Sequence, residues 1–166
     1  MGRYRPPQPK SSPYITAEGY AQLDAELKAL WKRRAIVTKA LSEAAAEGDR
    51  SENAEYIYRK KELREIDRRI RYLQKRLPDL KVVNHLPDNP EQVFFAAWVT
   101  LEDERGEKII YRIVGPDEFD PKKGWISMDS PMAKALLKKH IDDDVKVQTP
   151  KGIQHYIISH VRYADI

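Results

Sequence analysis

Four acidic residues lie close together in the segment Glu47–Glu55, which reads EGDRSENAE. Two of them, Asp49 and Glu52, are three residues apart. Carboxylate oxygens are the ligands that hard divalent cations such as Mg²⁺ prefer. If this segment is an exposed tip, Asp49 and Glu52 can hold such an ion, and a metal site is our first hypothesis for them.

The same residues also have a purely structural interpretation. Asp49 or Ser51 can cap a helix that begins here, with Glu52 completing a capping box three residues after Asp49. Acids in a first helical turn favour the helix dipole in any protein. Four acids are more than a cap needs, so the sequence leaves both interpretations open.

Two patterns of coiled-coil spacing meet at this segment and must position it. One runs from Tyr20 to Ala44 and the other from Glu52 to Leu77, in alternating steps of three and four residues. If the chain turns at Gly48, facing positions have numbers that sum to 96 or 97. The constant sum predicts an antiparallel helical hairpin with arms roughly 35–40 Å long.

Basic residues outnumber acids along the second helix. Between Arg59 and Arg76 there are nine Lys and Arg and three Asp and Glu. Balanced charges would serve solubility equally well, so the excess indicates a face for a phosphate backbone, although a solvated face stays open. Arg34 and Arg59 fall on the apolar seam, where their side chains can snorkel to solvent.

The composition excludes several classes of protein. The chain has 166 residues, no cysteine and a formal net charge of +4. The missing cysteines exclude disulfides, a thiolate zinc site and a cysteine nucleophile. No stretch reaches the length of a membrane span and no signal-peptide core is present, so we expect a cytoplasmic protein. No nucleophile elbow or Gly-rich phosphate loop occurs, and an autonomous enzyme is not expected.

The sequence predicts three regions in a two-domain α+β fold. Residues 1–13 are basic and Pro-rich and read as a disordered tail, residues 14–79 form the coiled-coil hairpin, and residues 80–166 form a small domain with an antiparallel sheet. In that domain Ser130 caps a short helix that starts at Pro131 and runs to about Lys139. The predicted strands span residues 93–101, 108–114, 125–128, 145–148 and 153–163.

Several further motifs follow the tip in the sequence. The tip itself, Gly48–Tyr56, is followed by the basic segment Lys60–Arg69, and Val93–Val99 and Asp129–Ala133 occur further on. Together these motifs resemble the bacterial transcript cleavage factors of the Gre type, GreB more than GreA. The resemblance covers about residues 14–164 in order. The Pro-rich N-terminal extension departs from the family pattern.

The resemblance implies a coiled coil inserted into the secondary channel of bacterial RNA polymerase and an FKBP-like C-terminal domain docked at the rim of the channel. The family's metal-assisting catalytic acids correspond to Asp49 and Glu52, and its rim contact corresponds to Asp129, Ser130 and Pro131. The basic patch that holds the extruded 3′ end of the nascent RNA corresponds to Arg59, Lys60, Lys61, Arg64 and Arg68.

On this resemblance the chain is a monomer that is not an enzyme by itself. It stimulates the polymerase's cleavage of backtracked RNA, and Asp49 and Glu52 help to hold a second Mg²⁺ in the polymerase active site. Two other functions stay open. One is a regulator that fills the channel without promoting cleavage, like DksA, and the other is a structural or general nucleic-acid-binding hairpin. The intact tip acids favour cleavage.

Overall fold

The computed structural model describes residues 10–48 and 53–163. The chain separates into two compact units. The helical unit spans Glu18–Leu80, and the sheet unit combines the chain up to Ala17 with the chain from Lys81 onward.

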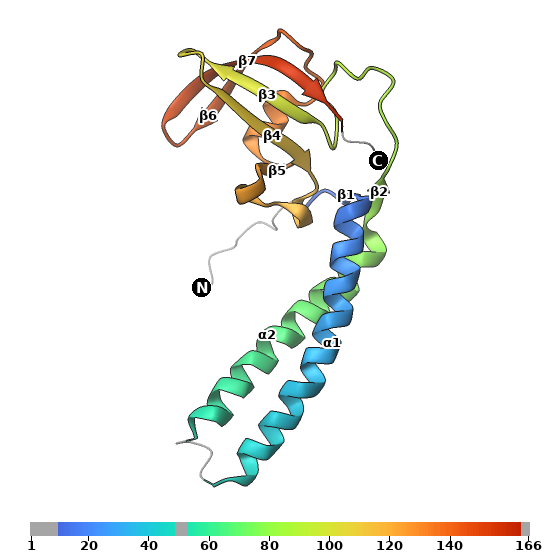
Figure 1. Ribbon diagram of the computed structural model, residues 1–166, viewed down its shortest axis with the longest axis vertical. Helices are drawn as coiled ribbons and strands as arrows, with labels where there is room; N and C mark the ends of the chain where they lie inside the picture. Colours follow the sequence, from blue (N-terminus) through green and yellow to red (C-terminus); the bar gives the residue numbers. More distant parts are fainter. Residues whose placement is uncertain (1–9, 49–52, 164–166) are drawn as a thin grey trace, which may run out of the picture. The chain divides into compact units, whose positions relative to one another are not determined.

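The helical unit is an antiparallel hairpin of α1 (Ala17–Ala46) and α2 (Ala54–Arg76), shown in Figure 1. The predicted seam is confirmed, because the side chains that the hairpin buries fall on seam positions. Those of α1 are Leu23, Val37 and Ala44, and those of α2 are Ile66, Ile70 and Leu73.

Local backbone chemistry explains where each of the two helices ends. After α1 ends, Gly48 adopts a φ of 136°, a backbone conformation that favours glycine. At the other end, α2 passes into a 3-10 turn at Leu77–Asp79. Pro78 lies in that turn and has no N–H to continue the helical ladder, so the helix stops near the predicted residue.

The sheet unit contains a five-stranded sheet in the order β5-β4-β3-β7-β6 among the described residues (Figure 1). The short helix α3 (Pro131–Leu136) contributes buried Ala133 and Leu136 to the core beneath the sheet. The strands are β3 (Trp98–Asp103), β4 (Lys108–Val114), β5 (Trp125–Ser127), β6 (Asp144–Thr149) and β7 (Gly152–Arg162).

The strand pairs β3–β4, β3–β7 and β6–β7 are antiparallel, as predicted. The edge strand β5 instead runs parallel to β4, so the sheet is mixed. The connection between these two strands contains the 3-10 turns Pro116–Glu118 and Pro121–Lys123. These turns carry the chain back only far enough for β5 to begin beside Arg112, and they contain no crossover helix.

Two element boundaries differ from the sequence prediction because a residue with a positive φ interrupts the predicted strand and another follows the shortened helix. The strand predicted from Val93 begins only at Trp98, since Ala96 has a φ of 71°. The helix predicted to reach Lys139 ends at Leu136, and Lys138 also has a φ of 71°. The backbone at Val93 instead bonds to Lys138 and Lys139, with N–O distances of 2.7 Å in both directions.

The N-terminal segment belongs to the sheet unit. Strand β1 (Tyr14–Thr16) pairs in parallel with β2 (Lys81–Val83). Just before it, the carbonyl of Pro13 accepts a bond from the N–H of Lys81 at 2.7 Å, and Ser12 is bonded to the side chain of Asp129. Residues 12 and 13, which the sequence assigned to a disordered tail, are therefore hydrogen-bonded parts of the fold.

A buried carboxylate fastens β1 to the rest of this unit. Glu118 is 8% exposed and accepts bonds from the N–H and the hydroxyl of Thr16 and from the N–H of Gly115. The backbone passes so close here that a Cβ added to Gly115 would lie 1.9 Å from the carbonyl oxygen of Tyr14. Gly115 is therefore required by the close approach of β1.

We expect Gly115→Ala to destabilise the sheet unit by about 3 kcal/mol, in the range of overpacked cores. Denaturant unfolding followed by near-ultraviolet circular dichroism would measure this loss. Alanine suits the φ of −69° at this position, so backbone strain does not contribute. We attribute the loss of stability to the clash with the carbonyl of Tyr14. In a chain lacking residues 1–16 the same substitution should cost almost nothing, and an undiminished cost there would contradict this explanation.

Candidate functional site

Asn53 caps α2 and links the two helices near the tip. Its side-chain carbonyl accepts a bond from the N–H of Tyr56 at 3.1 Å, and its amide group donates to the carbonyl of Ala44 at 2.8 Å. The prediction that Asp49 or Ser51 caps this helix is wrong, since α2 begins only at Ala54. The cap position is four residues beyond Asp49, the predicted start of the capping box, and Asn is as good a cap as Asp.

The two predicted metal-assisting acids, Asp49 and Glu52, lie outside the described residues. On either side of them, Glu47 and Glu55 are exposed. Within residues 10–48 and 53–163 no three His, Cys, Asp or Glu side chains are grouped in a way that could hold a metal ion. The described part of the chain thus offers no alternative metal centre to the tip.

Arg59, predicted to bind RNA, is engaged in ion pairs. Its guanidinium group lies 2.8 Å from Glu55 and 3.1 Å from Glu62, and its side chain is 23% exposed. Glu62 also pairs across the hairpin with Arg33 at 2.7 Å. The hydrogen bonds that Arg59 donates to Glu55 and Glu62 outweigh desolvation and raise the pKa of Arg59. Arg59 thus joins Glu55 in the first turn of α2 to Glu62, and Glu62 makes the contact with α1.

The same network sets the charge of Glu62. Desolvation acts to raise the pKa of its carboxyl, but hydrogen bonds and charges from Arg33 and Arg59 outweigh that effect and hold the pKa below the ordinary value of 4.5. A carboxylate with a lowered pKa in the fold stabilises the fold above its unfolded pKa. That contribution is lost as the pH falls through the lower, folded value.

We therefore expect acid to weaken the hairpin partly through Glu62. Thermal unfolding followed by helical circular dichroism should show a smaller loss in Glu62→Gln than in the unchanged chain between neutral pH and a pH of about 3. Glu65→Gln, on the same helix, is the matched control because Glu65 is exposed and takes no part in this network. Equal pH profiles for the Glu62 and Glu65 variants would contradict the assignment.

The other predicted RNA-binding residues are exposed on α2. Lys60, Lys61, Arg64 and Arg68 are all exposed. Lys60 lies over the ring of Tyr56, with Nζ 5.8 Å from its centroid. Among the described residues, no acid forms an ion pair with Lys61, Arg64 or Arg68.

Of the other charged residues on α2, some form ion pairs across the hairpin and others are exposed. Arg69 pairs across the hairpin with Glu26 at 2.9 Å, and Arg34 of α1 pairs with Asp67 at 2.7 Å. Arg71 and Lys75 are exposed and continue the spacing of three and four residues from Arg68. Arg71 and Lys75 are among the nine bases of the face predicted to meet phosphates, but they are not among the five residues named as RNA-binding. The basic stripe is defined here as Lys61, Arg64, Arg68, Arg71 and Lys75.

The three predicted docking residues lie together where α3 begins. Ser130 caps α3, as predicted, by accepting a bond from the N–H of Ala133 at 3.2 Å. Pro131 is exposed at the first helical position. Asp129 is partly buried, and its own N–H donates to the hydroxyl of Ser127 at 3.1 Å. We call residues 127–131 the docking loop.

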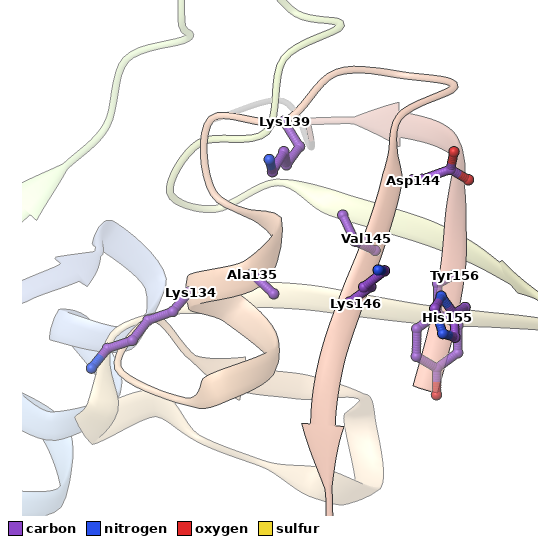
Figure 2. Close-up of a pocket in the computed structure, with 8 residues that line it drawn as sticks. All are labelled: Lys134, Ala135, Lys139, Asp144, Val145, Lys146, His155 and Tyr156. Carbon is purple, nitrogen blue, oxygen red and sulfur yellow. The ribbon is translucent and has the colours of Figure 1, made fainter. Parts of the chain in front are cut away.

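A groove of about 720 Å³ opens on another part of the sheet unit (Figure 2). It is lined in part by Lys134 and Lys139 near α3, by Lys146 on β6 and by His155 on β7. In Figure 2, Lys134 points away from Lys139 and Lys146. These charges do not surround a common point, and we assign no ligand to the groove.

None of the helices in the described part of the chain is sufficiently long and apolar to cross a bilayer. The charged surfaces of α1 and α2 account for this result, because ion pairs and exposed lysines recur along both helices.

Two family models match the chain. The N-terminal model of the transcription elongation factors matches residues 13–82, and the C-terminal GreA/GreB model matches residues 87–163. The chain therefore belongs to the GreA/GreB family of transcription elongation factors. The resemblance seen in the tip and basic segment is confirmed at the level of the family.

Several curated relatives carry the name transcription elongation factor GreB. The protein from Pseudomonas aeruginosa is 58% identical over 98% of each chain, and the protein from Yersinia pestis is 60% identical over 92% of this chain and 90% of its own. A solved structure of GreA factor homolog 1 from Thermus thermophilus is 28% identical, with a TM-score of 0.41, over 90% of this chain and 97% of its own.

Proposed function

We propose that the chain enters the secondary channel of bacterial RNA polymerase with its helical hairpin and stimulates cleavage of backtracked nascent RNA. The family and the identity to proteins named GreB support this function. The observation that carries it is the row of exposed cations on α2 that form no ion pair with a described residue, in the helix that follows Asp49 and Glu52 in the sequence.

The donor set at the tip suits Mg²⁺. Mg²⁺ prefers oxygen ligands and is usually held by one or two carboxylates together with waters and substrate phosphates. Asp49 and Glu52 supply two carboxylates, and Asn53 already fills the cap of α2, so capping does not require either acid. A second Mg²⁺ held with the polymerase would activate a water for attack on the RNA phosphodiester.

Within this proposal the chain's own residues have separate tasks. Asp49 and Glu52 supply negative charge and oxygen ligands to an active site whose remaining parts belong to the polymerase. Asn53 bonds the start of α2 to α1, and Arg59 joins Glu55 to Glu62 within α2, in the turns that follow these acids in the sequence. The chain is accordingly a cofactor protein for another enzyme's chemistry.

The basic stripe supplies a track for the extruded RNA. Its guanidinium and ammonium groups are spaced along one face of α2 and are free to contact successive phosphates. Arg59 lies outside the stripe, because its charge is neutralised by Glu55 and Glu62. We propose that Arg59 positions the tip and that the stripe contacts the RNA.

A cross-linking experiment tests this placement. RNA with a photoreactive base in the extruded segment of a backtracked complex is expected to cross-link to α2 around Lys61–Arg68, and not to the sheet unit. The alternative of a general nucleic-acid-binding hairpin predicts equal cross-linking to free RNA without polymerase. Cross-links that do not depend on polymerase would therefore reject the proposed function.

A further inference from the structure

Two carboxylates of the sheet unit hold the N-terminal segment in the same way. Asp129 accepts bonds from both the N–H (2.9 Å) and the hydroxyl (2.5 Å) of Ser12. Glu118 accepts bonds from both the N–H and the hydroxyl of Thr16. Ser12 and Thr16 are four residues apart, so the segment between them is attached at both ends.

The attachment at Asp129 differs from the one at Glu118 in its location. Glu118 is buried beside β1, and holding β1 in the fold is a sufficient explanation for its bonds to Thr16. Asp129 lies in the docking loop, and each of its two carboxylate oxygens is engaged by Ser12. A carboxylate held in this way has less capacity to bind a partner directly than an exposed one, since existing bonds would first have to break.

We propose that Ser12 is a positioning residue of the docking surface and that Asp129 acts on docking through Ser12. This inference rests on the proposed docking of the loop to polymerase. The bonds hold the backbone of the loop against the segment 12–16, with Ser130 and Pro131 following directly at the start of α3. The partner then meets a surface made by Pro131 and by the segment at Ser12, and not the Asp129 carboxylate.

A double-mutant cycle separates this role from direct contact. The full chain carrying Ser12→Ala, Asp129→Ala or both would be tested in competition with a labelled unchanged chain for polymerase. We expect each single variant to bind about tenfold more weakly, and the double variant to bind no more weakly than Asp129→Ala alone. Ser12→Thr, which keeps both donors, should restore binding, and Ser11→Ala is the matched control on the neighbouring exposed residue.

A second readout separates positioning from a general loss of folding. At saturating concentrations the Ser12→Ala chain should stimulate cleavage at the unchanged maximal rate, and only the concentration for half-maximal stimulation should rise. Unfolding would instead lower the melting temperature and the maximal rate at physiological temperature.

Four results would overturn the proposal. Normal binding by Ser12→Ala together with weak binding by Asp129→Ala would show that Asp129 contacts polymerase itself, and so would single effects that multiply in the double variant. Tighter binding by Ser12→Ala would show that the segment covers the surface. Pro131→Glu, which suits a first helical position, tests the underlying function. If it and Asp129→Ala both bind normally, the docking loop itself is misassigned and the role of Ser12 is rejected with it.

Discussion

Replacing Asp49 with Asn, or Glu52 with Gln, is expected to reduce stimulated RNA cleavage by about two orders of magnitude, the usual cost of losing one group that stabilises a transition state. Both changes keep the size of the side chain and remove its charge. Binding to polymerase should remain nearly unchanged, because the proposed docking residues lie in the sheet unit. Cleavage of labelled RNA in a backtracked complex, with Mg²⁺ varied, measures the effect.

The competing explanation for these acids is helix capping, and stability measurements distinguish the two. Asn53 occupies the cap of α2 and bonds to the N–H of Tyr56. Loss of charge at Asp49 or Glu52 should therefore change the free energy of unfolding by less than about 0.5 kcal/mol, as for ordinary surface substitutions. Asn53→Ala, the matched control, should cost about 1 kcal/mol. Full cleavage by both acid variants at limiting Mg²⁺ would reject the metal role.

The second large effect concerns the basic stripe. The triple variant Lys61→Gln, Arg64→Gln, Arg68→Gln should weaken cleavage in deeply backtracked complexes much more than in complexes backtracked by a few nucleotides. Short extruded RNA would not reach these residues. Each lost phosphate contact should also flatten the salt dependence by about 0.7 in the logarithmic slope, so three contacts give about 2.

Two control variants make this prediction specific. A triple variant on α1, with Lys28, Lys32 and Lys39 changed to Gln, lowers the net charge equally on exposed side chains of the other helix. Arg59→Gln should disturb the tip and reduce cleavage equally for short and long extruded RNA, since Arg59 joins Glu55 to Glu62. If the stripe variant also loses activity equally on both, with an unchanged salt slope, the stripe serves polymerase docking and not the transcript.

The hairpin could be predicted from the sequence because its spacing reports burial directly. Leu23, Val37, Ile66 and Leu73 stand at seam positions, and each is buried. The N-cap of α2 could not be located with the same accuracy. Asp49, Ser51 and Asn53 are all good capping residues, and their spacing does not decide which one precedes the first helical turn.

Arg59 shows where a charge count misleads. It was grouped with the exposed cations of α2, yet it lies on the seam and pairs with acids four residues before and three residues after it. That spacing is the standard one for helical ion pairs and was visible in the sequence. The sequence already places Arg59 on the seam, but the charge count alone groups it with the RNA-binding residues.

The contacts of the N-terminal segment could not have been predicted. Ser12 meets Asp129 across 117 residues, and Thr16 meets Glu118 across 102. Single polar pairs produce no periodic signal, and a Pro-rich segment of low apolar content indicates disorder on composition alone. The direction of β5 was hidden for a related reason, since the turns before it show no helical pattern that would indicate a parallel connection.

Adding the purified chain to stalled, backtracked elongation complexes with labelled RNA tests the central claim most directly. We expect rapid, Mg²⁺-dependent release of a short 3′ fragment, followed by renewed elongation of the shortened transcript. A chain that occupies polymerase, as shown by competition with a labelled copy, but leaves the RNA uncut would contradict the proposed function. It would then be a regulator that fills the channel without promoting cleavage.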